Sequence, residues 1–277
     1  MSNAFPADTY YLYALGASPF PLSKGEFMEL KQARSILIDA LAFEQKFELL
    51  RANWLALELA VVELGLQSKV DGRTEWYEKG SEWFNVLNRH IMNMLTTAQA
   101  YEDQVKGDFK SAPMSPTFEE QAAARFSQAF DSSFNYRFMD ALRNVAQHGQ
   151  LPVHNVGGSD GKYHWSESLS FHAHRKEIEG DRRFRAKTFK ETPESVDLRV
   201  ASRDYVGNLS GVHVDLRNLV KPHVESARLA TSETLAKYEA AMGGKFGSLR
   251  AFAPDSEQQE PVLVMLDWDN VRVKLAA

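Results

Sequence analysis

The feature that most constrains this chain is an apolar stripe that continues without interruption through much of its first quarter. Apolar residues recur there every three or four positions: Ile36, Ala40, Phe43, Phe47, Leu50, Trp54, Leu57, Val61 and Leu64. This is the spacing of one face of an α-helix, and the stripe continues for about eight turns at 3.6 residues per turn. A helix this long, or two nearly collinear helices, needs other helices to cover its apolar face. The stripe therefore predicts a helical protein.

Further helical stripes follow the first one. A second stripe covers residues 83–105, and shorter ones cover residues 116–130 and 134–145. Gly149 then provides a typical helix stop. Because the connections between these segments are short, residues 23–150 predict an antiparallel helical bundle.

The rest of the chain has a different character. Residues 1–22 predict an irregular N-terminal arm, and residues 151–195 a basic, His-rich loop or hairpin region. Helical spacing returns over 196–245, which predicts one long helix. Residues 246–277 predict a loop followed by strands, because Val271, Val273 and Leu275 alternate with polar residues. The expected fold class is thus mainly α, with a small β element in the C-terminal half.

Composition excludes several classes of chemistry. The chain has no cysteine, which excludes thiolate metal sites, a cysteine nucleophile and a disulfide scaffold. Its net charge of −5 argues against a strongly basic nucleic-acid coat protein. We expect no membrane-spanning helix, because no stretch approaches 18 uncharged apolar residues. The N-terminus does not have the pattern of a secretion signal, so a cytoplasmic protein is expected.

The most specific motif lies at the end of the predicted bundle. Arg143 is followed directly by Asn144, and His148 comes five positions after the arginine. Here the chain resembles the HEPN family (higher eukaryotes and prokaryotes nucleotide-binding domains), whose signature is Arg-x(4–6)-His with a polar residue after the arginine. The family places this motif on a late helix of an all-α bundle. The resemblance covers about half of the chain.

The resemblance implies an activity and partners. Many HEPN proteins are metal-independent endoribonucleases that form a symmetric dimer, with both motifs lining one cleft. It implies that His148 is the general acid–base, that Arg143 stabilises the phosphate, and that Asn144 orients the histidine. No metal or cofactor is implied. RNA, a second copy of the chain and an antitoxin or defence-system protein are the implied partners, since such proteins occur in toxin–antitoxin and phage-defence systems.

The residue types fit this chemistry, but the spacing sets a condition. Asn144 and His148 share a helix face, so the amide can orient the imidazole. Arg143 and His148 lie about 140° apart on an ideal helix, and they converge only if the last turn loosens or a partner chain completes the site. Alternatively, Arg143 pairs with a carboxylate such as Asp140, and His148 only caps the helix C-terminus. The protein would then be a non-catalytic HEPN-like module for nucleotide or RNA binding or for dimerisation.

A basic stretch follows the motif. It contains seven cations and three carboxylates between residues 172 and 190, with interleaved phenylalanines. Positive charge with aromatic rings suits binding of single-stranded RNA, although a solvated hairpin would have the same composition. The candidate RNA-binding residues are Arg175, Lys176, Arg182, Arg183, Arg185 and Lys187.

Two weaker candidates remain. Arg217, Asn218 and His223 repeat the motif pattern, but His223 lies on an apolar stripe after a proline, so a partly buried core histidine is expected there. Five histidines also lie close together in sequence (His148, His154, His164, His172 and His174). They suggest a His-metal hydrolase as a third function, although solvated or hydrogen-bonded histidines are the favoured interpretation.

Overall fold

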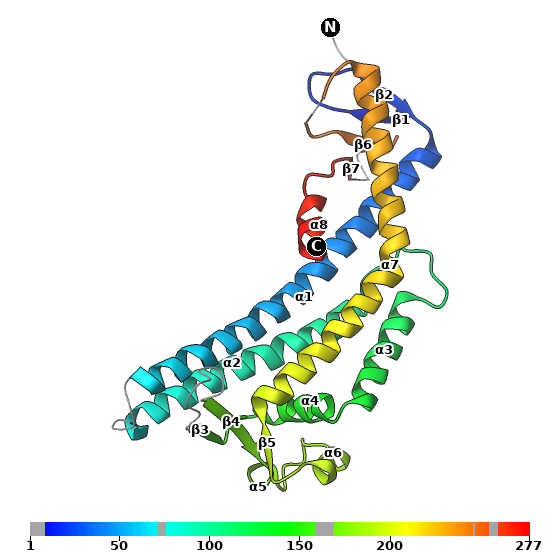
Figure 1. Ribbon diagram of the computed structural model, residues 1–277. Helices are drawn as coiled ribbons and strands as arrows, with labels where there is room; N and C mark the ends of the chain where they lie inside the picture. Colours follow the sequence, from blue (N-terminus) through cyan, green and yellow to red (C-terminus); the bar gives the residue numbers. More distant parts are fainter. Residues whose placement is uncertain (1–8, 71–75, 159–168, 246, 255–259) are drawn as a thin grey trace. The chain divides into compact units, whose positions relative to one another are not determined.

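A computed structural model describes residues 9–70, 76–158, 169–245, 247–254 and 260–277 (Figure 1). The helices are α1 (Lys24–Val70), α2 (Trp76–Val105), α3 (Phe118–Ser132), α4 (Phe134–Ala146), α5 (Arg175–Ile178), α6 (Ala186–Glu191), α7 (Leu198–Met242) and α8 (Asp269–Ala276). The strands are β1 (Tyr10–Tyr13), β2 (Phe20–Leu22), β3 (Asn155–Gly158), β4 (Leu169–His174), β5 (Ser195–Asp197), β6 (Arg250–Phe252) and β7 (Val262–Leu263). The predicted fold class, mainly α with a small β element in the C-terminal half, is confirmed.

The chain divides into two compact units. The first consists of Met1–Gln45, Gly107–Glu119 and Leu216–Ala277, and the second of Lys46–Lys106 and Glu120–Asp215. Neither unit is a single stretch of sequence, because α1 and α7 each contribute residues to both.

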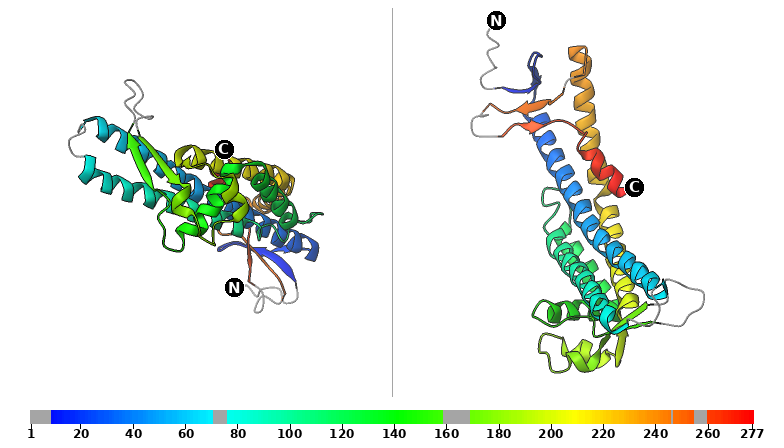
Figure 2. Two further views of the ribbon diagram at one scale, coloured as in Figure 1. Left: turned by 90° about the horizontal axis from the view of Figure 1, so that it is seen from below. Right: turned by 90° about the vertical axis from the view of Figure 1, so that its left-hand side faces the viewer.

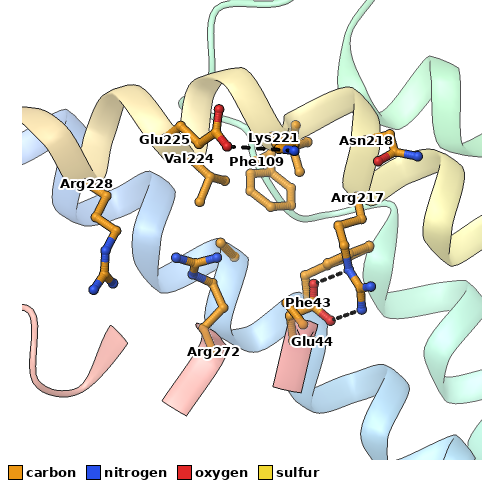
Figure 3. A pocket seen from close by; sticks show the side chains of 13 residues that line it. Phe43, Glu44, Phe109, Arg217, Asn218, Lys221, Val224, Glu225, Arg228 and Arg272 are labelled. Carbon is orange, nitrogen blue, oxygen red and sulfur yellow. Dashed lines mark hydrogen bonds and ion pairs between the residues drawn. The ribbon is translucent and has the colours of Figure 1, made fainter. Parts of the chain in front are cut away.

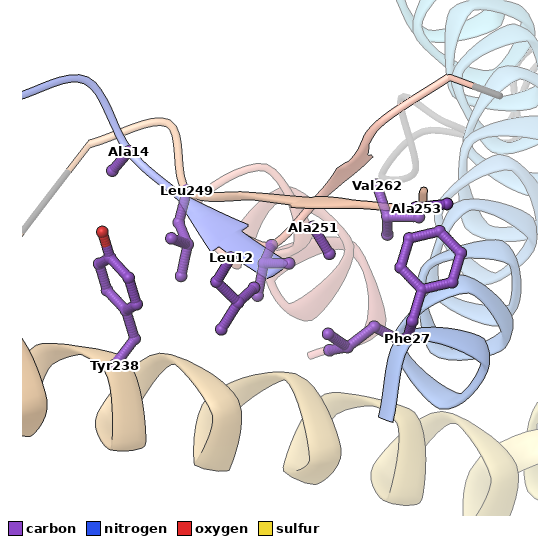
Figure 4. Close-up of a cluster of buried hydrophobic side chains, with 10 residues drawn as sticks. Leu12, Ala14, Phe27, Tyr238, Leu249, Ala251, Ala253 and Val262 are labelled. Atoms are coloured by element: carbon purple, nitrogen blue, oxygen red, sulfur yellow. The ribbon is translucent and has the colours of Figure 1, made fainter. Parts of the chain in front are cut away.

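The first unit is built around a small antiparallel sheet. Its strand order is β2-β1-β6-β7, and β1 pairs with β6 through Tyr11 opposite Phe252. Apolar side chains of this sheet meet Phe27 of α1 and Tyr238 of α7 in one buried cluster (Figure 4). The N-terminal segment, predicted to be an irregular arm, therefore contains two strands. Its pairing partner β6 is more than 200 residues away in the sequence, where local patterns cannot reveal it.

The second unit has a helical core with a buried histidine at its centre. Tyr101 of α2 contacts Phe47 of α1, with ring centroids 5.6 Å apart, and Phe126 of α3 at 6.0 Å. The Tyr101 hydroxyl lies 2.9 Å from Nδ1 of His213 on α7. Four helices thus meet at one aromatic group, and the predicted apolar stripes of α1 and α2 form the buried faces.

A three-stranded antiparallel sheet with the order β3-β4-β5 completes the second unit. Strand β3 lies beside α2 (Figure 2). Along β4 the side chains alternate between buried and half-buried, so Leu169, Phe171 and Ala173 form its inner face. This alternation holds the sheet against the helices.

The two predictions of β structure towards the C-terminus differ from the structure in part. Within the predicted loop or hairpin region 151–195, β3 and β4 pair antiparallel, but residues 175–178 and 186–191 form α5 and α6. Residues 271–275 are not a strand but part of α8. The alternation of valines there does not bury one face, since the relative exposures of Val271 and Val273 are 48% and 43%.

Candidate functional site

The motif helix α4 is defined at both ends by local interactions. The Ser133 hydroxyl accepts a hydrogen bond from the Tyr136 N–H at 3.1 Å and caps the first turn. Phe138 and Leu142 are fully buried and fix which face of the helix is inside. At the other end, Gly149 has a φ of +111°, a conformation that favours glycine and ends the helix.

The end of α4 is loosened where the motif requires it. Helix α4 ends at Ala146, and the His148 N–H donates to the Val145 carbonyl at 3.1 Å, three residues back. His148 therefore lies in a turn beyond the regular helix, and it is exposed. The backbone is thus irregular at His148, and convergence of the Arg143 and His148 side chains stays a prediction.

Arg143 is held within its own helix. The side chain is 15% exposed, and its Nη2 lies 3.6 Å from Oδ1 of Asp140, one turn earlier. Its Nη1 donates to the Gln147 side chain at 3.4 Å. Burial raises the pKa of Asp140, and the charges of Arg185 and Arg143 oppose that rise. The alternative in which Arg143 pairs with Asp140 thus describes part of the observed geometry.

Asn144 and His148 do not form the expected pair. Asn144 is half-buried on the last turn of α4, and no hydrogen bond joins it to His148 in the described part of the chain. Instead, the His148 carbonyl accepts a hydrogen bond from Nη1 of Arg183 at 3.2 Å. Arg183 of the basic stretch, and not Asn144, is thus hydrogen-bonded to His148, through the backbone carbonyl.

The basic stretch packs against the motif helix. Arg185 lies 3.3 Å from Oδ2 of Asp140, and Phe184 packs edge-on against Phe138 with ring centroids 5.7 Å apart. Arg137 of α4 also binds Glu191 of α6 at 2.8 Å. The two sequence features predicted to carry function therefore form one local structure in the second unit.

The six predicted RNA-binding residues have different roles. Arg183 and Arg185 approach α4, as described. Arg175 instead binds the Thr192 carbonyl at 3.2 Å and stacks over the Phe189 ring at 4.6 Å, so it stabilises this segment internally. The cations that project into solvent are Lys176, Arg182 and Lys187.

Asp181, which neither the motif nor the basic stretch indicates, also belongs to this site. Its carboxylate binds Arg183 through Nε at 2.8 Å and Nη2 at 2.5 Å. Hydrogen bonds from the side chain and the backbone N–H of Arg183, together with its positive charge, lower the pKa of Asp181 to about 2. The available signal was the Asp-Arg-Arg sequence after Gly180, which is typical of a turn stabilised by an aspartate.

The histidine cluster forms a strand contact. His172 and His174 share the outer face of β4, as expected for a strand. His154 Nδ1 accepts a hydrogen bond from the His174 N–H at 2.8 Å, and burial lowers its pKa. Among the described residues, no three His, Asp or Glu side chains form a metal-binding group, and His164 lies outside those residues.

The second motif match belongs to the first unit. Arg217 binds Glu44 through Nε at 2.8 Å and Nη2 at 2.6 Å. His223 is half-buried, as predicted. Arg217 and Asn218 line a cavity between α1, α7 and α8 (Figure 3), which the motif pattern did not reveal.

Two further observations bear on function. No helix in the described part of the chain is long and apolar enough to span a membrane. In comparisons with known proteins, no family model, no curated protein and no solved structure matches this chain. The resemblance of the Arg143–His148 motif to the HEPN family therefore stays a prediction.

Proposed function

We propose that the protein is a metal-independent endoribonuclease of the HEPN type, with His148 as its acid–base group. The observation that supports this proposal most is the position of His148. Its exposed imidazole lies just past the end of α4, and its own carbonyl is bound by Arg183. Histidine can exchange protons near neutral pH, and guanidinium groups bind phosphate through paired hydrogen bonds.

The proposed reaction uses the RNA itself as the nucleophile. His148 accepts the proton of a ribose 2′-OH while that oxygen attacks the adjacent phosphorus. The bond from phosphorus to the 5′-oxygen breaks, and this oxygen takes a proton from a second acid. The products are a 2′,3′-cyclic phosphate and a free 5′-OH. In a symmetric dimer, the second acid would be His148 of the other copy.

The guanidinium groups would act on the phosphate. Arg185 and Arg143 both pair with the buried carboxylate of Asp140. The Arg185 side chain is 54% exposed, so its guanidinium group would be accessible to a phosphate in solvent. Lys176, Arg182 and Lys187 project into solvent and would bind the RNA backbone outside the scissile group.

The test is RNA cleavage by the purified chain in EDTA. A single-stranded RNA should be cleaved, and the same RNA with 2′-O-methyl groups should not be cleaved. His148→Ala should lower the rate at least about a hundredfold, the usual size of an acid–base contribution. Gln150→Ala changes a neighbouring exposed residue and serves as the matched control. Full activity of His148→Ala would overturn the proposal.

The second candidate function is non-catalytic RNA binding or dimerisation with the same fold. The observation that favours it is the contact of Arg143 with Asp140 and Gln147, because an arginine engaged within its own helix is less available to a phosphate. In this case the wild type would bind RNA without cleaving it. Arg182→Ala and Lys187→Ala would weaken that binding, and His148→Ala would leave it unchanged. A toxin or phage-defence role, with its antitoxin or defence partner, would require the catalytic function.

A further inference from the structure

The first unit contains a cavity that has the size of a small-molecule site. Its volume is about 390 Å³, and residues of α1, α7, α8 and the segment before α3 line it (Figure 3). Phe43, Phe109 and Val224 form its apolar wall. Pockets for small organic ligands start at about 300 Å³ and are mostly apolar with a few polar groups. The cavity meets the size condition, and its lining combines an apolar wall with several charged side chains.

The aromatic part of this wall is held in place by its surroundings. Phe109 has a φ of +55°, a left-handed conformation that is unfavourable for a bulky side chain. It is nevertheless 1% exposed, with its ring 5.9 Å from Phe43 and 4.9 Å from Phe118. Backbone conformations of this kind persist where neighbouring groups fix them, often at binding sites. The wall is therefore formed before any ligand arrives.

The polar groups of the cavity carry an excess of positive charge. Four cations line it against two carboxylates: Arg217, Lys221, Arg228 and Arg272 against Glu44 and Glu225. Arg217 is matched by Glu44 through two hydrogen bonds. Lys221 and Glu225 are both well exposed and 3.9 Å apart, so their attraction is weak.

The excess of positive charge lies at Arg228 and Arg272, which share a single carboxylate. Asp269 has no exposed surface and accepts hydrogen bonds from Nε and Nη2 of Arg272 at 2.6 Å and 2.9 Å. Nη1 of Arg228 binds the same carboxylate, and its Nη2 donates to the neutral side chain of Asn270 at 2.9 Å. Two guanidinium groups thus face one negative charge. In Figure 3, the Arg272 side chain points from α8 toward the part of α7 that carries Val224.

We propose that this cavity binds a small organic anion. An oxyanion group of the ligand (carboxylate, sulfonate or phosphate) would bind beside Arg228 and Arg272, within reach of Lys221. An aromatic or aliphatic body would pack against Phe109 and Val224. This inference does not depend on the proposed ribonuclease, because all of its residues belong to the first unit.

Two fluorescent probes with the same ring system test the proposal on the full chain. 8-Anilinonaphthalene-1-sulfonate carries an anionic group, and N-phenyl-1-naphthylamine lacks it. We expect saturable binding of one anionic probe per chain, at least about tenfold tighter than binding of the neutral probe, the usual effect of a charge-assisted hydrogen bond. Raising the salt concentration should weaken the binding of the anionic probe only.

Three variants locate the binding within the cavity. Arg272→Gln should weaken binding of the anionic probe about tenfold, while Arg228 remains paired with the buried Asp269. Lys221→Glu should also weaken this binding, and it removes no partner of a buried group. Val224→Phe, which fills the cavity, should abolish binding. Arg250→Gln and Lys31→Glu are matched controls on exposed positions, and circular dichroism confirms that each variant is folded.

The outcomes separate the two parts of the proposal. Equal binding of both probes, unchanged in Arg272→Gln and Lys221→Glu, would overturn the anion site. Binding that persists in Val224→Phe would show that the probe lies elsewhere, and absence of saturable binding would overturn the proposal as a whole. Loss of binding in Lys221→Glu together with full binding in Lys31→Glu would support it even if Arg272→Gln does not fold.

Discussion

The imidazole ring of His213 lies flat against the ring of Phe47, with centroids 4.0 Å apart and 8° between the planes. The same imidazole is fully buried and is bonded to the Tyr101 hydroxyl. A buried polar group needs such a partner, because leaving it without one costs its full desolvation energy. This histidine therefore links α1, α2 and α7 through one stacked ring and one hydrogen bond.

The first prediction concerns the stability of this group. His213→Ala should lower the free energy of unfolding by about 3 kcal/mol, because it leaves a cavity and removes the ring contact. Tyr101→Phe should cost about 1–2 kcal/mol, since it keeps the ring but removes the hydroxyl that is bonded to the buried imidazole. Urea unfolding measures both. A smaller effect for His213→Ala than for Tyr101→Phe would contradict the central role of the stacked ring.

The second prediction concerns the attachment of α8. Asp269→Asn should lower the free energy of unfolding by about 3 kcal/mol, because breaking a buried ion pair leaves charge without compensation. Asp267→Asn alters an exposed carboxylate two residues earlier and should change stability by less than about 0.5 kcal/mol. Denaturant unfolding gives the two values. Hydrogen exchange over residues 269–276 then shows whether α8 opens locally in Asp269→Asn.

The third prediction is a dependence on pH. Burial lowers the pKa of His154 below its ordinary value of 6.5, so the folded protein binds a proton there less readily than the unfolded chain does. The stability that this gives is present above pH 6.5 and is lost as the pH falls. The wild type should lose more stability between pH 7 and pH 5 than His154→Asn, whose Oδ1 replaces the Nδ1 acceptor without titrating. Equal losses in unfolding experiments at the two pH values would refute the assignment.

The fourth prediction separates the structural from the catalytic role of Arg143. Arg143→Ala should lower the free energy of unfolding by about 1–3 kcal/mol, because it leaves the buried Asp140 with less compensation. Asp140→Asn in the same chain should restore part of that loss, and the restored amount in a double-mutant cycle is their coupling energy. RNA cleavage by the stabilised double variant is then the informative measurement. A rate close to the wild-type value would assign Arg143 to structure alone.

Much of the helical architecture could be predicted from the sequence. The stripe from Ile36 to Leu64 is the buried face of one helix, and the helix expected from about residue 196 runs over Leu198–Met242. Ser23 and Glu26, three residues apart, form a capping box at the start of α1. These features depend on residues within a few turns of one another, and such local interactions are what periodicity and capping rules describe.

The remaining features depend on distant partners. Arg183 is bonded to the His148 carbonyl 35 residues away, and no spacing rule connects the two. The sequence suggests Asp140 as a partner of Arg143. Asp140 also pairs with Arg185, which belongs to a segment expected to be a loop or hairpin, and no spacing rule connects these two residues. The burial of Asp269 between Arg228 and Arg272 likewise depends on how α7 and α8 pack.

The two long helices have a consequence for how this protein can be divided. Helix α1 passes from one compact unit to the other between Gln45 and Lys46, and α7 does so between Asp215 and Leu216, in both cases without a loop. A fragment that ends at either point would expose a cut helix end with unpaired backbone groups. Neither unit can therefore be expressed as a separate module by cutting the chain at these points.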